Sequence, residues 1–188
     1  IGIIIPVLPK LILSLMGGEF YRAAQMVGIF MSIWALMQFI FSPIMGALSD
    51  RFGRRPVILM SNLGLGLDYL IMAMAPALWV LMVGRVLAGI FSATVSTAQA
   101  YIADITPPEK RAAAFGMLGA AFGLGFVLGP ALGGLLGHYD LRLPFLAASF
   151  MSLVNFVYGY FVLPESLPKE LRTPFRLKTA NPVSSLRM

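Results

Sequence analysis

The sequence predicts an all-α membrane protein with about six spanning helices. Hydrophobic residues make up 59% of the 188 residues and charged residues only 12%, whereas soluble domains hold roughly 45–50% and about 25%. The apolar residues lie in six stretches separated by short polar breaks. These stretches lack the alternation of barrel strands, and backbone groups in lipid have no water to bond, so helices are expected.

Each stretch is interpreted in chain order as one span. A bilayer core of about 30 Å needs about 20 helical residues, and five stretches are long enough. The first is too short, and we interpret it as the end of a truncated first span, because the chain starts at Ile1 with apolar residues and no charged leader. The predicted spans are residues 1–15, 24–47, 57–75, 78–103, 112–136 and 143–163.

Lysine and arginine predict the orientation. Ten of them lie in one set of breaks and the tail, against three in or near the alternate breaks, which places the first set in the cytoplasm. The ten are Arg51, Arg54, Arg55, Lys110, Arg111, Lys169, Arg172, Arg176, Lys178 and Arg187, and the three are Lys10, Arg22 and Arg142. The net charge of +6 therefore reflects topology rather than nucleic-acid binding, and both termini are predicted to be cytoplasmic.

The chain divides into a transmembrane domain, residues 1–163, and a polar tail, residues 164–188. Pro168, Pro174 and Pro182 punctuate the tail, which predicts a cytoplasmic linker. The sequence has no cysteine and one histidine, His138, so thiolate and imidazole metal sites are not expected. An integral-membrane enzyme is the least favoured class, because no clustered carboxylate pair is present either.

Residues 46–56, GALSDRFGRRP, connect the second and third predicted spans as a tight hairpin. Gly46 and Gly53 permit close packing and a turn, and Pro56 suits the first turn of the next helix. Asp50 lies among three arginines, so a charge-assisted clamp across the loop is available. The alternative is that the arginines only fix the topology.

Two charges lie inside predicted spans. Asp68 in the third and Arg85 in the fourth are each eight residues from the turn at Pro76–Ala77, hence about 12 Å from it and at similar depth. An ion pair between them is geometrically feasible. An unpaired charge in a membrane costs several kcal/mol, and intramembrane charges indicate function by default, with a purely structural pair as the alternative.

Glycines of the fifth predicted span recur at spacings of four and form strips on which another helix can pack closely. One strip is Gly119 and Gly123, and the other is Gly125, Gly129 and Gly133. The Gly129-Pro130 pair adds an expected kink.

Together these stretches resemble the major facilitator superfamily. The segment GALSDRFGRRP is similar to its signature loop, GRVLAG from Gly84 to its fourth-helix arginine motif, and GAAFGLGFVLGPALGG to its fifth-helix antiporter motif. With PVLPKL and LDYL, they resemble the tetracycline/proton antiporter group over essentially the whole chain. The resemblance implies the N-terminal six-helix half, built from 3+3 repeats, of a carrier whose second half follows the linker.

The same resemblance implies roles for the intramembrane residues. Asp68 would couple proton entry to drug exit, with Arg85 beside it on the transport route. Gln38, near the middle of the second span, would be a weaker substrate contact, although a buried glutamine usually only bonds a neighbouring helix. The acidic residue that the group has in its first helix falls before Ile1.

Asp104 ends the fourth predicted span, and the resemblance implies that it joins Asp50 and Arg54 in a latch that holds the cytoplasmic side shut. The gate motif comprises Gly46, Asp50, Arg51, Gly53, Arg54, Arg55 and Asp104. The antiporter motif comprises Gly125, Gly129, Pro130, Gly133 and Gly134.

The expected function is proton-coupled efflux of a drug-like molecule across a bacterial-type cytoplasmic membrane by alternating access. Tetracycline-like compounds are the nearest substrates, travelling as magnesium chelates, and no cofactor is expected. The partners are lipid, drug, protons, and either a missing C-terminal half or a second copy that imitates it. Alternatives are a carrier of another small solute, and a fragment or membrane interaction module without transport activity of its own.

Overall fold

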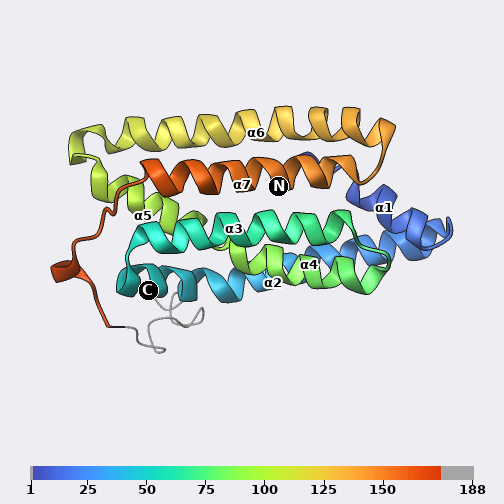
Figure 1. The fold of residues 1–188 in the computed structure, drawn as a ribbon, viewed down its shortest axis with the longest axis horizontal. Coiled ribbons are helices and arrows are strands. Elements are labelled where there is room, and N and C mark those ends of the chain that lie inside the picture. The colour runs from blue at the N-terminus through green and yellow to red at the C-terminus, as the bar shows by residue number, and fades with distance from the viewer. Residues whose placement is uncertain (1, 175–188) are drawn as a thin grey trace.

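The structure, a computed structural model, describes residues 2–174, and the tail residues used above beyond this range lie outside the described part. Helices account for nearly all of it, and they lie side by side (Figure 1). In chain order they are η1 Gly2–Ile4, α1 Leu8–Leu15, α2 Phe20–Phe52, α3 Arg54–Ala73, α4 Leu78–Ser92, α5 Val95–Ile105, η2 Pro108–Lys110, α6 Arg111–Tyr139, α7 Leu143–Val162 and η3 Lys169–Leu171.

Five helical segments are long and apolar enough to cross a membrane, which confirms the five full-length spans predicted from sequence. They are α2, α3, the α4–α5 pair, α6 with the turn before it, and α7. The first predicted span is represented by η1 and by α1, which has only 8 residues. Large apolar side chains on the outside, such as Val127 and Phe161, are exposed as expected for a lipid-facing surface.

Successive spans run antiparallel because short connections join them. The α2–α3 turn, the α5–α6 connection and the segment after α7 meet at one end of the bundle, on the left in Figure 1. We call this the Gly53 end. The α3–α4 and α6–α7 connections lie at the other end, together with α1.

The tight hairpin predicted for residues 46–56 is present and turns at Gly53, but the residues on both sides of Gly53 are helical, so the span boundaries predicted at Ala47 and Val57 were wrong. Helix α2 continues to Phe52, α3 begins at Arg54, and only Gly53 separates them. No glycine or proline follows Gly46 before Gly53, and charged residues can continue a helix where it leaves the lipid. Pro56 does lie in the first turn of α3, as predicted.

The fourth predicted span is broken into α4 and α5 at Ala93–Thr94. The Thr94 hydroxyl bonds the hydroxyl of Ser61 on α3, and Thr94 Oγ1 donates to the Phe91 carbonyl at 3.0 Å. Threonine side chains that bond local carbonyls compete with the helical ladder, which explains a break without glycine or proline.

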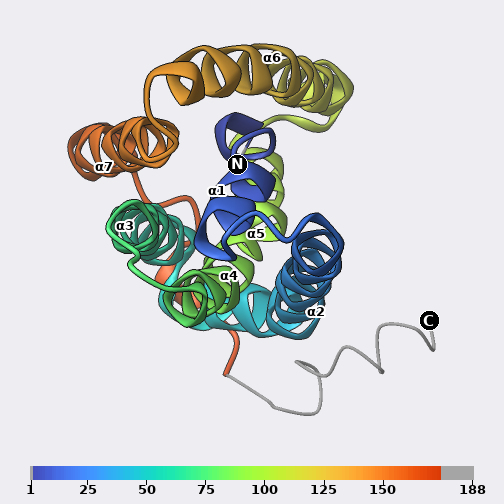
Figure 2. The same cartoon turned by 90° about the vertical axis from the view of Figure 1, so that its right-hand side faces the viewer.

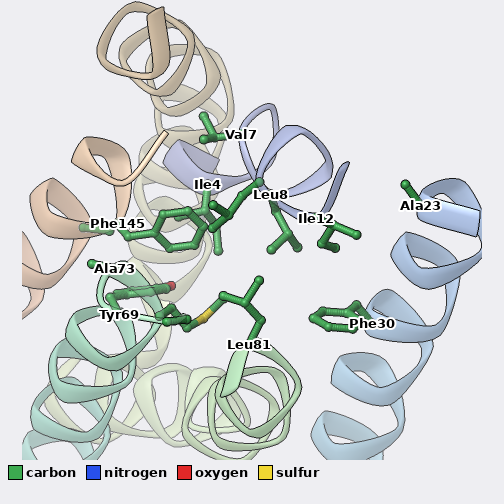
Figure 3. Close-up of a cluster of buried hydrophobic side chains, with 14 residues drawn as sticks. Ile4, Val7, Leu8, Ile12, Ala23, Phe30, Tyr69, Ala73, Leu81 and Phe145 are labelled. Atoms are coloured by element: carbon green, nitrogen blue, oxygen red, sulfur yellow. The ribbon is translucent and has the colours of Figure 1, made fainter. Parts of the chain in front are cut away.

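A cluster of buried apolar side chains lies at the end opposite Gly53, around α1 (Figures 2 and 3). Leu8 and Ile12 of α1 are fully buried, and Leu81, Phe145 and Phe30 reach them from α4, α7 and α2. Tyr69 and Met72 of α3 belong to the same cluster, so apolar packing joins α1 to four spans at this end of the bundle.

Candidate functional site

Arg54 is the centre of the predicted gate motif. Its Nη1 lies 2.5 Å from Asp50 Oδ1 and donates to Ser49 Oγ at 2.6 Å, and its Nε donates to Asp104 Oδ2 at 3.2 Å. The Arg54 side chain is only 13% exposed. One guanidinium therefore joins α2, α3 and α5, and the contact expected between Arg54 and Asp104 is present, while its role as a latch stays a prediction.

Ser49 is a member of this cluster that sequence reasoning missed. It is fully buried, accepts from Arg54, and donates its own hydroxyl proton to the Gly46 carbonyl at 2.7 Å. Gly46 itself lies inside α2, and nothing in the described chain lies within 4 Å of a Cβ built there. Within the described chain nothing packs closely on Gly46, so close packing there stays a prediction, and the Gly46 carbonyl contributes to the cluster.

Arg54 is the arginine that forms an ion pair with Asp50, and among the described residues neither Arg51 nor Arg55 bonds this carboxylate, so the charge-assisted clamp uses one of the three arginines. The Arg51 guanidinium lies 5.0 Å from the Phe52 ring centroid. Arg55 Nη2 donates to the Tyr160 carbonyl at 2.5 Å, and its guanidinium lies 5.6 Å from that ring. Arg55 thus ties the start of α3 to the end of α7.

Gly53 forms the whole turn between α2 and α3. Its backbone φ is +106°, a value that residues other than glycine rarely adopt. A Cβ at this position would also run into the carboxylate of Glu165, 2.7 Å from its Cδ. Backbone conformation and a close neighbour both require glycine here.

Glu165, the second residue of the predicted linker, was not identified from sequence. Its Oε1 accepts the backbone N–H of Arg54 at 2.8 Å and that of Leu167 at 3.1 Å. The carboxylate therefore caps the first turn of α3, where the N–H groups lack helical partners. The only sequence signal is an acidic residue directly after the last span, following Pro164.

Asp68 and Arg85 lie inside the bundle on adjacent helices, with exposures of 1% and 4%. Among residues 2–174 no ion pair joins them, and neither carboxylate oxygen of Asp68 has a hydrogen-bond partner. Arg85 Nη2 lies 3.9 Å from the sulfur of Met72, one turn after Asp68 on α3. The structure brings both charges into the interior at similar depth but leaves them unpaired.

Gly84 explains how the carboxylate fits between α3 and α4. A Cβ at Gly84 would lie 3.0 Å from Asp68 Oδ1 and 2.5 Å from Met72 Cγ. The glycine before Arg85 therefore lets Asp68 lie against the α4 backbone. Packing against Asp68 thus explains why a glycine precedes Arg85 in the predicted fourth-helix motif.

Gln38 is half-buried and bonds a neighbouring helix, which is the structural alternative to a substrate role. Its Nε2 donates to the Ser92 carbonyl at 3.4 Å, directly before the α4–α5 break. This contact leaves the amide oxygen available, so the predicted substrate role stays a prediction.

The glycine strip of α6 receives the first residues of the described chain. A Cβ at Gly129 would lie 2.9 Å from Gly2, and one at Gly133 would lie 2.8 Å from the Ile3 carbonyl carbon. The close approach predicted for this strip is confirmed at these two glycines. A Cβ at Gly119, Gly123, Gly125 or Gly134 would have no neighbour within 4 Å in the described part. Helix α6 continues through Pro130, and the kink stays a prediction.

No group of three or more potential His, Asp or Glu ligands for a metal lies within residues 2–174. The polar groups of the interior are instead a carboxylate, a guanidinium, a glutamine amide and hydroxyls. Such a set can exchange a proton and bind polar parts of an organic molecule.

A family model described as Major Facilitator Superfamily matches residues 1–188, and the chain belongs to this superfamily. It is a multi-pass membrane protein with the superfamily's helical fold. The crystal structure of the human organic anion transporter MFSD10 (TETRAN) matches it with a TM-score of 0.79 and 27% identity, over 92% of this chain and 46% of that chain.

Curated relatives are more similar in sequence. The class C tetracycline resistance protein of Escherichia coli is 50% identical over 187 residues, covering 100% of this chain and 46% of the relative. The class E tetracycline resistance protein of Escherichia coli is 45% identical over 166 residues, covering 88% and 40%. The chain thus spans less than half the length of these relatives.

Proposed function

We propose that this chain forms the N-terminal half of a proton-coupled exporter of drug-like molecules, with tetracycline-like compounds the nearest substrates. Relatives named for tetracycline resistance support the substrate class. The observation that carries the proposal is Asp68, a carboxylate buried to 99% without a partner among the described residues, next to a buried arginine. Membrane proteins place such charges where ions or substrates pass.

Asp68 and Arg85 supply the coupling chemistry in this proposal. A carboxyl group in a dry interior exchanges its proton only when the site opens to water on one side. A carboxyl that gains a proton from outside and loses it to the cytoplasm lets proton entry drive drug exit. Arg85, fixed at the same depth, favours the charged form whenever water reaches the site, and Gln38 would contact the drug.

The Arg54 cluster is the gate in this proposal. The excess of lysine and arginine at the Gly53 end supports a cytoplasmic location for that end and for both termini, in a bacterial-type cytoplasmic membrane. Arg54 joins α2, α3 and α5 there, so breaking its contacts would let these helices separate. Asp50, Arg54 and Asp104 would hold this side shut while the coupling site faces outward.

The complete carrier needs a second half, because this chain spans less than half of its relatives. That half is a C-terminal segment or a second copy of the chain, related in the same membrane orientation. The drug would enter as its magnesium chelate, so magnesium belongs to the substrate. A half without transport activity of its own and a carrier of another small solute are the alternatives.

Inside-out vesicles test the proposal. Tetracycline uptake driven by a proton gradient is measured with magnesium present, for the chain alone and for the chain co-expressed with the remaining part of the class C relative. Uptake in either arm is expected to disappear in Asp68→Asn and to persist in Glu109→Gln, an exposed acidic residue at the Gly53 end. Uptake that survives Asp68→Asn removes the coupling role.

The mass of the complex in detergent separates the alternatives. A dimer that is active alone supports the second-copy arrangement. A monomer that is active only with the added half supports the fragment. Failure of both arms, in vesicles where the full-length class C relative is active, overturns the exporter proposal.

A further inference from the structure

The segment directly after α7 packs against the gate cluster instead of leaving the bundle. We call residues 164–173 the linker strap. It crosses the Gly53 end from α7 toward α2, where the Thr173 N–H donates to the Asp50 carbonyl at 3.1 Å (Figure 1). At its start the Pro164 carbonyl accepts the hydroxyl of Tyr101 from α5 at 3.1 Å. The strap is thus bonded to both helices that carry the acidic partners of Arg54.

Glu165 holds the backbone of Arg54. Its Oε1 accepts the Arg54 N–H at 2.8 Å, at the positive end of the α3 dipole. Its other oxygen lies 3.7 Å from Arg172 Nη2, so the strap folds around its own carboxylate. The absent side chain and positive φ of Gly53 leave the space in which this carboxylate lies.

Ser166 holds the other partner of the ion pair. Asp104 Oδ2 accepts both Arg54 Nε and Ser166 Oγ, each at 3.2 Å. Two consecutive strap residues therefore fix the two sides of one contact, the backbone of Arg54 and the carboxylate of Asp104. Partly exposed ion pairs are weak when two long side chains must lose their freedom to meet. Fixing both partners beforehand removes much of that loss.

We propose that Glu165 and Ser166 are positioning residues of the Arg54–Asp104 contact, so that the linker sets how firmly this end of the bundle closes. The inference rests on the latch role proposed above for that contact. Movement of the strap would release Arg54 and Asp104 at the same time. A conformational change that displaces the linker would therefore open the gate.

A cysteine placed behind the latch reports its opening. The sequence has no cysteine, so Thr97→Cys is the only thiol, at a side chain that is 1% exposed and has no bonding partner in the described part. Thr97 lies seven residues before Asp104 on α5, about 10 Å deeper in the bundle. The rate of labelling by a water-soluble maleimide is measured on the full chain in detergent, in the fraction that elutes as folded protein.

Asp104→Ala is the reference for an open latch. In the Thr97→Cys background, Glu165→Ala is expected to speed labelling about threefold to tenfold, because losing the cap of α3 makes opening easier by that factor. Glu165→Gln keeps an oxygen acceptor for the Arg54 N–H and is expected to stay near the background rate. Ser166→Ala is expected to produce a smaller increase, and Glu170→Ala, an exposed acidic residue of the same segment, none. The double variant Asp104→Ala/Glu165→Ala should label no faster than Asp104→Ala alone.

Each result decides one step. If Asp104→Ala does not speed labelling, the latch itself fails. If it does, but Glu165→Ala and Ser166→Ala stay at background, the latch stands and the positioning proposal is overturned. Additive rates in the double variant also overturn it, because they indicate a general loss of stability. If Glu165→Ala does not elute as folded protein, Ser166→Ala with Glu165→Gln decides by the same criteria.

Discussion

Charged side chains are paired at the Gly53 end of the bundle and unpaired in its middle. At the Gly53 end Arg54 is paired with Asp50 and Asp104, and Glu165 with Arg172. In the middle, Asp68 and Arg85 are almost fully buried and form no ion pair within the described chain. Desolvation makes pairing most needed where water is absent, so the interior arrangement does not serve stability. The contrast separates charged groups that bond helices to one another from charged groups that are left free inside the bundle, as the proposed gate and coupling roles require.

The strongest way to break this comparison is to neutralise Asp68. Asp68→Asn keeps size and polarity but cannot exchange a proton, so proton-driven uptake should fall to that of vesicles without the protein. The melting temperature in detergent should not fall, because an amide is less costly to bury than an unpaired carboxylate. A clear drop in melting temperature would show that Asp68 is part of a stabilising pair, contrary to the contrast drawn above.

The paired end should respond differently, by losing stability as well as closure. Arg54→Ala removes hydrogen bonds to Asp50, Ser49 and Asp104. The two carboxylates are partly exposed, at 45% and 27%, so each of these ion pairs contributes at most about 1 kcal/mol, and the bond to buried Ser49 adds about 1 kcal/mol. Unfolding should therefore become easier by about 2–3 kcal/mol. Membrane insertion should persist while uptake is lost.

Arg51→Ala is the matched control for Arg54→Ala, because Arg51 contacts only a neighbouring ring in the described part. Changes at such surface positions are usually within about 0.5 kcal/mol. Thermal unfolding in detergent and vesicle uptake measure both variants, and equal losses would show that the contacts of Arg54 do not distinguish it from the other arginines of the motif.

Span positions could be predicted from sequence because lipid leaves the backbone no partner except its own helix. The helical continuation from Ala47 to Phe52 was missed because polarity marks the lipid boundary and not the end of a helix. The break at Ala93–Thr94 was missed because hydroxyl competition depends on Ser61 of another helix. Hydropathy thus predicts where helices lie but not how they bond one another.

The site was predictable where its parts are close in sequence or share a depth. Asp50 and Arg54 are one turn apart, and equal distances from one turn placed Asp68 and Arg85 at one level. Glu165 was missed because it lies 111 residues from Arg54 and meets it only when the linker folds back. The missing pairing of Asp68 with Arg85 depends on helix rotation, which spacing from a turn does not fix.

Two glycines near the paired end, Gly53 and Gly46, test whether the backbone of the α2–α3 turn also stabilises this end. Gly53→Ala forces a side chain into a positive-φ position beside the Glu165 carboxylate, and such strain costs about 1–3 kcal/mol. Gly46→Ala adds a methyl group inside α2 without a close neighbour in the described part, and should be neutral or stabilising. The two melting temperatures in detergent measure the difference, and a Gly53→Ala variant as stable as Gly46→Ala would mean that the turn is not held in this conformation.

The smallest effect is expected away from all charges, where only packing is at stake. A methyl group on Gly133 would press on the Ile3 backbone, 2.8 Å from its carbonyl carbon, and overpacking costs about 1–3 kcal/mol, toward the lower value here because the η1 turn has only 3 residues to move. Gly134→Ala, one position along α6, meets no atom within 4 Å in residues 2–174 and should leave the melting temperature unchanged. Since neither change touches a titratable group, proton-driven uptake should follow folded amount in both. Uptake lost in Gly133→Ala at full stability would show that the contact between η1 and α6 moves during transport, and would add a packing element to the coupling proposed for Asp68 and Arg85.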